Sequence, residues 1–149
     1  MSCNPTKPTN PKDALSVDRV PMHLFPRTAI LWGAMAFHEG QLKYDPYNWR
    51  EAGIRASVYY GALQRHMDAW WDGEDVDPKS GLPHLAKALA CIAIMIDAQE
   101  VPGEDEMFVD DRPTPGGYAR LLEELTPLVA EMREKIQSEH HSRTEEETP

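Results

Sequence analysis

The chain has 149 residues, a hydrophobic fraction of 41% and a formal net charge of −10. This length fits one domain with one hydrophobic core. Its 15 Lys and Arg residues against 25 Asp and Glu residues argue against a nucleic-acid partner, because proteins that bind duplex backbones carry basic surfaces. Two cysteines are too few for a disulfide framework and indicate a reducing, cytoplasmic compartment. The longest apolar run, Leu85 to Ala98, is too short for a membrane span.

The two ends of the chain are polar and lack a helical pattern. Residues 1–18 contain three prolines among Asn, Thr and Lys, and we predict an extended leader there. Residues 139–149 are polar throughout, and we predict a disordered acidic tail. Between them, residues 19–138 form the predicted single α-helical domain.

Four segments carry apolar residues at helical spacing. The predicted helices extend over about 26–44, 49–72, 83–100 and 118–136. Pro83 suits a first helical turn, because its missing N–H would be unpaired there anyway. The connection from Val101 to Gly117 is rich in Pro, Gly and Asp, and we predict irregular structure with a short β-like patch at 107–109. The fold class is therefore all-α, a helical bundle of about four helices.

The apolar spacing also predicts which faces are buried. The stripe of the first helix is Ile30, Ala34 and Phe37. The expected buried face of the second helix is Ala56, Tyr60, Leu63, Met67 and Trp70. The third helix has a main stripe of Leu85, Leu89, Ile92 and Ile96, with Ala86, Ala90 and Ala93 on the neighbouring face. A helix that is apolar on most sides belongs in the centre of a bundle.

An acidic segment joins the second and third helices, with five carboxylates in the ten positions from Asp68 to Asp77. Crowded carboxylates raise each other's pKa unless a cation offsets them, and Mg²⁺ or Mn²⁺ takes oxygen ligands and keeps several waters. His66 and Glu74 lie roughly 80° apart around a helix, so both could face one site. His84 starts the next helix, where the dipole favours neutral imidazole and a nearby anion. The alternative is a solvated turn, with His66 as a satisfied core histidine.

A second polar segment lies between the first and second helices. It combines cations with aromatic residues, in the order Glu39, Lys43, Tyr44, Tyr47, Asn48, Trp49, Arg50 and Arg55. Aromatic rings stack on nucleobases, Asn reads a base edge, and Lys or Arg holds phosphate. The alternative is an aromatic-anchored turn, with Asn48 as the N-cap and Trp49 packed on the bundle.

Residues 10–13, 43–50 and 65–86 together resemble the phage dATP/dGTP diphosphohydrolase family, MazG-like relatives of the all-α NTP pyrophosphohydrolases. The resemblance covers about residues 10–98. It implies hydrolysis of dGTP or dATP to the monophosphate and pyrophosphate, a Mg²⁺ or Mn²⁺ cofactor, and a homodimer or homotetramer. The likeness is to members from phages that replace adenine by 2-aminoadenine, where dGMP would feed synthesis of the modified nucleotide.

The chain departs from the metal-binding pattern of the wider MazG-like superfamily, which uses Glu-x-x-Glu on one helix and Glu-x-x-Asp on the next. Here Leu42 follows Glu39 at the third position, and the third helix offers His84 and Lys87 in place of an acidic pair. We therefore choose ligands from the residues of this chain. The predicted metal ligands are Glu39, His66, Glu74, Asp77 and His84, with Asp97 as a further candidate. The predicted catalytic residues are His66, Glu74 and Asp77. The predicted substrate-binding residues are Lys12, Lys43, Asn48, Trp49, Arg50 and Arg55.

Two other functions stay open from the sequence. A non-catalytic helical oligomer, such as a phage regulatory module, would use the acidic segment as a solvated joint and its tryptophans as a subunit interface. A nucleotide sensor would bind the purine triphosphate without cleaving it. We expect neither a nucleic-acid partner nor a membrane partner in any of these cases.

Overall fold

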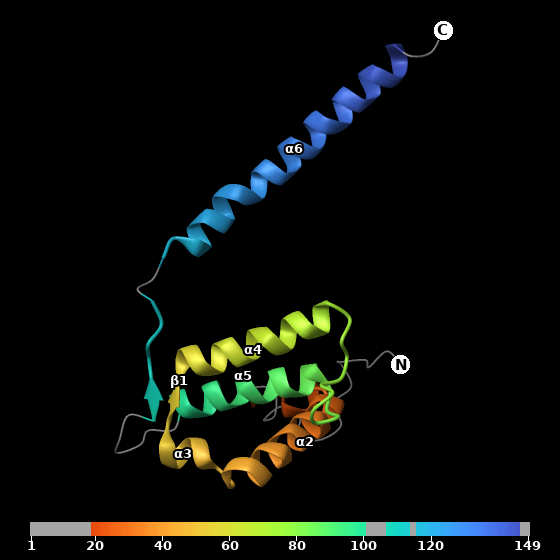
Figure 1. Cartoon of the computed structure of the whole chain (residues 1–149). Coiled ribbons are helices and arrows are strands. Elements are labelled where there is room, and N and C mark those ends of the chain that lie inside the picture. The colour runs from red at the N-terminus through yellow and green to blue at the C-terminus, as the bar shows by residue number, and fades with distance from the viewer. Residues whose placement is uncertain (1–18, 101–106, 114–115, 147–149) are drawn as a thin grey trace, which may run out of the picture. The chain divides into compact units, whose positions relative to one another are not determined.

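The computed structural model describes residues 19–100, 107–113 and 116–146. Helices make up most of this part of the chain (Figure 1), which confirms the predicted all-α fold class. The elements in chain order are η1 (Met22–Leu24), α2 (Arg27–Tyr44), α3 (Asn48–Ala52), β1 (Ile54–Arg55), α4 (Ala56–Trp71), α5 (His84–Glu100), β2 (Phe108–Val109) and α6 (Tyr118–Glu146). None of the described helices is both long and apolar enough to cross a membrane. The predicted leader, residues 1–18, lies outside the described residues.

Helix α5 lies between α2 and α4 and contacts both (Figure 1). Small residues form the centre of the contact with α2, where Ala36 packs with Ala86 and Ala90. A Cβ atom added to Gly33 of α2 would lie 3.2 Å from Cδ2 of Leu89, so this glycine allows a close approach of the two helices. The third predicted helix is therefore central to the bundle, as its composition indicates.

The predicted buried faces agree only in part with the burial in the structure. The alanine face of α5 is buried, with Ala86 and Ala90 at 3% and 9% exposure. The larger residues Ile30, Tyr60 and Ile96 were expected to be buried and are 52%, 56% and 56% exposed. Those expectations were wrong. The helices α2 and α5 meet through glycine and alanine, and close contact at small residues leaves their bulky side chains outside the contact.

The second predicted helix is interrupted, which corrects the prediction of one continuous helix after Asn48. Gly53 adopts a positive φ of 71°, which ends α3 and turns the backbone into β1. Strand β1 pairs in parallel with β2, with Ile54 opposite Phe108 and Arg55 opposite Val109. The β-like patch predicted at 107–109 therefore contains the strand β2. Its partner β1 lies in the segment that the apolar spacing predicts to be helical.

The start of α4 is held by a residue that is distant in the sequence. The Asp111 carboxylate accepts a hydrogen bond from the backbone N–H of Ser57 at 2.8 Å and another from the Ser57 hydroxyl at 2.5 Å. A carboxylate at a helix N-terminus pairs with otherwise unpaired N–H groups and with the positive end of the dipole. The segment after β2 therefore fixes where α4 begins.

The chain divides into two compact units, Met1–Asp111 and Arg112–Pro149, whereas we predicted one domain over 19–138. The second unit contains α6, which continues to Glu146, past the predicted end at Ile136 and into the segment predicted as a disordered tail. Pro127 lies inside this helix. Its large apolar residues are exposed, among them Leu121, Leu125, Leu128 and Met132.

Candidate functional site

The connection between α4 and α5, residues 72–83, is here named the acidic joint. It is a hydrogen-bonded turn, in which the Asp77 N–H donates to the Leu82 carbonyl at 2.9 Å and the His84 N–H donates to the Asp75 carbonyl at 3.0 Å. Val76 and Pro83 form an antiparallel bridge across it. Most of its carboxylates are exposed, but the turn directs Asp77 inward, where its side chain is only 13% exposed.

Asp77 is bonded on several sides. Its carboxylate accepts hydrogen bonds from the Lys79 N–H at 2.9 Å and the Ser80 hydroxyl at 3.2 Å, and it forms an ion pair with Lys87. The bond from Lys87, followed by that from the Lys79 N–H, holds the pKa of Asp77 well below its usual range. Asp77 is therefore an ionised, largely covered carboxylate at neutral pH.

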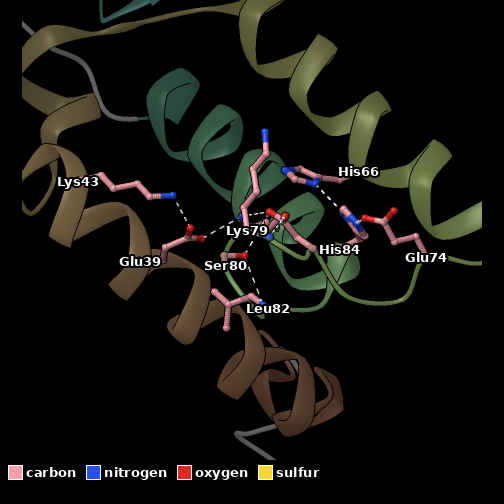
Figure 2. Close-up of polar contacts among 10 residues, drawn as sticks. Glu39, Lys43, His66, Glu74, Lys79, Ser80, Leu82 and His84 are labelled. Carbon is pink, nitrogen blue, oxygen red and sulfur yellow. Dashed lines mark hydrogen bonds and ion pairs between the residues drawn. The ribbon is translucent and has the colours of Figure 1, made fainter.

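Lys87 connects this carboxylate to α2. Its Nζ lies 3.3 Å from Oε2 of Glu39 and also contacts Asp77, and the Lys87 side chain is 13% exposed. Lys43, one turn further along α2, pairs with the same Glu39 carboxylate (Figure 2). Burial raises the pKa of Glu39, but the bonds from Lys43 and Lys87 outweigh it and leave the pKa below its ordinary value. Two carboxylates from distant segments thus meet at one ammonium group.

His66, His84 and Glu74 form a hydrogen-bonded chain beside this group (Figure 2). Nδ1 of His66 lies 2.9 Å from Nδ1 of His84, and Nε2 of His84 lies 2.9 Å from Oε1 of Glu74. An ionised Glu74 can only accept, so neutral His84 donates from Nε2 and accepts at Nδ1. His66 must then donate from Nδ1, which leaves the lone pair of its Nε2 available.

The surroundings of His66 favour its neutral form. Burial, followed by the charge of Lys87, lowers the pKa of the His66 imidazole. His84 itself is 6% exposed, and among the described residues it is the one polar or charged residue that is buried. The arrangement therefore presents an unprotonated imidazole nitrogen whose partner ring and carboxylate fix its tautomer.

The donors suit a divalent ion at one position. Among the described residues, no three His, Cys, Asp or Glu side chains are grouped so as to hold a metal by themselves. However, Glu39 and Asp77 meet at a cation, and Mg²⁺ is commonly held by one or two carboxylates, with water and substrate phosphates as its other ligands. These two oxygen donors fit such an ion. The predicted ligands His66, Glu74 and His84 are instead bonded to one another.

The opposite end of α5 holds a second cluster around Asp97. Arg50 donates two hydrogen bonds to the Asp97 carboxylate, at 2.8 and 2.7 Å, and the Trp49 indole donates a third at 2.7 Å. These bonds, first from Arg50 and then from Trp49, lower the pKa of Asp97 to about 2. Trp49 also packs on Phe37, with ring centroids 5.2 Å apart. The carboxylate of Asp97, a candidate metal ligand, is therefore bonded to an arginine and a tryptophan.

A pocket of about 470 Å³ opens beside this cluster. Its lining includes Phe37, Gln41, Tyr47, Trp49, Arg50 and Asp97. Its volume is in the range of small-molecule sites. Gln41 and Glu39 are two positions apart on α2 and therefore roughly 160° apart around its axis. The pocket and the carboxylates at Lys87 thus lie on different sides of α2, although the sequence predicts that both groups bind one nucleotide.

The remaining predicted substrate residues are dispersed. Asn48 is the first residue of α3, follows the N-cap Tyr47 and lines a separate pocket of about 260 Å³. The assignment of Asn48 as N-cap is therefore wrong, because Tyr47 takes that position with a positive φ of 58°. The packing of Trp49 on the bundle, the other part of that alternative, is confirmed by its contact with Phe37. Arg55 pairs with Asp111 at 3.5 Å. Lys12 lies outside the described residues. Binding of substrate by Lys43, Asn48, Trp49, Arg50 and Arg55 stays a prediction.

Lys87 is a site residue that the sequence motifs do not identify. It appeared only as a departure from an acidic motif, although a lysine three residues after His84 falls on a neighbouring part of the same helix face. The signal that could have identified it is charge balance. Two carboxylates that are partly covered need a cation nearby, and Lys87 is in the third helix close to the acidic segment.

Residues 9–111, more than half of the chain, match the model of a protein family described as dATP/dGTP diphosphohydrolase, N-terminal. The matched region includes the acidic joint, Lys87 and the histidine chain, whereas α6 lies beyond it. No curated protein and no solved structure matches the chain significantly.

Proposed function

Because the chain belongs to the dATP/dGTP diphosphohydrolase family, we propose that it hydrolyses purine deoxynucleoside triphosphates to the monophosphate and pyrophosphate. The observation that carries the proposal is the meeting of two carboxylates at one cation, beside an imidazole nitrogen with a free lone pair. Both features lie in the matched region. Metal-assisted hydrolysis needs a place for a cation and an acceptor for a proton, and this cluster offers both.

The proposed holders of Mg²⁺ or Mn²⁺ are Glu39 and Asp77. A divalent ion at this place would neutralise phosphate charge and lower the pKa of an attacking water. Asp77 is suited to this role because the turn fixes its carboxylate through the Lys79 N–H and the Ser80 hydroxyl. Glu39 comes from α2, so the site links this helix to the acidic joint, which is distant in the sequence.

The proposed proton acceptor is Nε2 of His66. His84 and Glu74 act through it, because their hydrogen bonds fix the His66 tautomer and would stabilise the positive charge that His66 gains. Metal ligation by His66, Glu74 and His84 stays a prediction from the sequence, and the proposed mechanism does not depend on it. No covalent intermediate is involved, since water is the nucleophile.

Lys43 is the proposed phosphate-binding cation of the site. Its side chain is 52% exposed and ends at Glu39, so it can turn toward a polyphosphate at the same carboxylate. A positive charge there would stabilise the negative charge that develops on the leaving pyrophosphate. In a phage that replaces adenine by 2-aminoadenine, the dGMP product would supply synthesis of the modified nucleotide.

The test is an assay of the purified full-length chain with each deoxynucleoside triphosphate and Mn²⁺, with monophosphate and pyrophosphate separated by chromatography. We expect dGTP or dATP to give both products in equal amounts. Asp77→Asn should lose turnover, whereas Asp72→Asn, which removes an exposed carboxylate of the same joint, should retain it. If no purine triphosphate were turned over, the proposal would be wrong.

We also propose that the chain assembles as a homodimer or homotetramer. The first unit exposes many large apolar side chains, including Ile30, Leu31 and Met35 on α2, and a second copy would cover such a surface. The same surface suits the alternative function, a non-catalytic helical oligomer, which predicts assembly without turnover. Light scattering after size exclusion gives the oligomeric state, and the nucleotide assay separates the two functions.

A further inference from the structure

Lys87 lies where a bound cation would lie. Its ammonium group contacts Asp77 and is 3.3 Å from Glu39, and these are the two carboxylates that the proposed function assigns to the divalent ion. An ammonium group and a divalent ion cannot both occupy the space between two carboxylates. In this respect Lys87 differs from Lys43, which contacts Glu39 but has no bond to Asp77 among those described.

We propose that Lys87 is a built-in counter-cation that competes with the divalent ion for Glu39 and Asp77. This inference rests on the proposed function, because it takes its two metal ligands from there. Without the ion, Lys87 offsets one of the two carboxylate charges and holds α2 against the acidic joint. When the ion binds, Lys87 must leave at least one carboxylate, and its free ammonium is then next to the bound polyphosphate.

The burial of the group supports competition over a purely structural role. The side chains of Lys87 and Asp77 are each 13% exposed and that of Glu39 is 20% exposed, so water screens their charges only in part. The bonds of Asp77 to the Lys79 N–H and the Ser80 hydroxyl do not involve Lys87. Glu39 keeps its ion pair with Lys43. Loss of the Lys87 charge therefore leaves two positioned carboxylates with more negative charge between them.

The test is calorimetric titration of the full-length chain with Mn²⁺ alone, without nucleotide. Lys87→Gln should bind Mn²⁺ about tenfold more tightly than the natural chain, because it lacks the competing charge. Lys87→Arg keeps the charge and should stay close to the natural affinity. Lys43→Gln is the matched control, since it removes an exposed lysine from Glu39 only and should change the affinity less than Lys87→Gln does.

A second measurement uses the unaltered chain, in case Lys87→Gln does not fold. NMR of the lysine ammonium groups should show a Lys87 signal that is protected from exchange with water, because the group is bonded and covered. Addition of Mg²⁺ should shift this signal or abolish its protection. A Lys87 signal that stays unchanged at saturating Mg²⁺ would contradict the inference.

The outcomes separate this inference from the proposed function. Tighter Mn²⁺ binding by Lys87→Gln, with little change in Lys43→Gln, supports competition. Unchanged or weaker binding by Lys87→Gln overturns it, while purine triphosphate hydrolysis by the natural chain would still support the proposed function. If the natural chain bound no Mn²⁺ and hydrolysed no nucleotide, both would be wrong.

Discussion

The two ends of α5 each hold an aspartate bonded to a cation, but they use it differently. At the far end, Asp97 receives two bonds from the planar guanidinium of Arg50 and one from Trp49. At the joint end, Asp77 shares the ammonium of Lys87 with Glu39. A two-point contact to one arginine is closed to other cations, whereas a point charge between two carboxylates can be exchanged.

This difference indicates which end performs chemistry. The Asp97 cluster connects α3 to α5 and packs an aromatic ring against α2, which stabilises the bundle. The Asp77 cluster joins an exchangeable cation to a histidine with an available lone pair. We therefore expect substitutions at the joint end to reduce turnover and substitutions at the far end to reduce stability.

The largest expected effect is on turnover in His66→Ala. Loss of the proton acceptor should reduce kcat by about 10² to 10⁴-fold, the usual contribution of a general base, while circular dichroism shows unchanged helicity. Glu74→Gln should have a smaller effect, because it disturbs only the tautomer of His84 and, through it, His66. Turnover in His66→Ala close to that of the natural chain would contradict the role of this residue.

The next effect is on stability in Asp97→Asn. The substitution removes the ion pair with Arg50 and weakens the bond from Trp49, so the free energy of unfolding should fall by about 1 kcal/mol, a value reduced by partial exposure. Urea denaturation followed by tryptophan fluorescence measures this change. Asp72→Asn, in the exposed part of the joint, is the control and should leave the midpoint unchanged. An unaltered midpoint in Asp97→Asn would show that the cluster does not stabilise the bundle.

A smaller loss of stability is expected in Asp111→Ala. This change removes the carboxylate that accepts from both the N–H and the hydroxyl of Ser57, so the first turn of α4 loses its anion. The melting temperature should fall by a few degrees, less than in Asp97→Asn. Ser57→Ala removes one of the two bonds, so its melting temperature should lie between those of Asp111→Ala and the natural chain.

The smallest effect is a pH dependence of stability from His66. Burial lowers the folded pKa of this imidazole below the ordinary value of about 6.5, so the unfolded chain binds more protons below that pH. Stability should therefore fall as the pH drops below about 6.5, until the pH reaches the lowered folded pKa. Asp97 affects the pH dependence only at lower pH. Its stabilisation is complete above pH 3.8 and is lost as the pH falls from 3.8 to about 2. Denaturation of His66→Asn across the same pH range should show a reduced slope in the upper interval.

The sequence allowed the fold class, the helix-rich central segment and the position of the acidic joint to be predicted. Apolar spacing located α2 and α5 because these helices are regular over several turns. It failed at residues 53–55, because the pairing of β1 with β2 is a contact between distant segments that local spacing does not record. It also failed for Tyr60 and Ile96, since spacing identifies an apolar face but not whether alanine or a bulky residue makes the contact.

The sequence predicted which residues belong to the candidate site, but not which of them are bonded to one another. Glu39, His66, Glu74, Asp77 and His84 were all named, and the structure brings them near Lys87 or into the histidine chain. The sequence alone could not divide them into a pair of carboxylates and a hydrogen-bonded relay. That division depends on which side of each helix faces the joint, and on the inward turn of Asp77.

The most direct test compares kcat for dGTP hydrolysis in Asp77→Asn and Asp97→Asn at saturating Mn²⁺, with both proteins folded. We predict that Asp77→Asn loses about 100-fold or more, because it removes one of the two carboxylates proposed to hold the cation. Asp97→Asn should keep a kcat near that of the natural chain despite its lower stability. Full activity in Asp77→Asn, with the loss in Asp97→Asn instead, would place the chemistry at the other end of α5 and contradict the account.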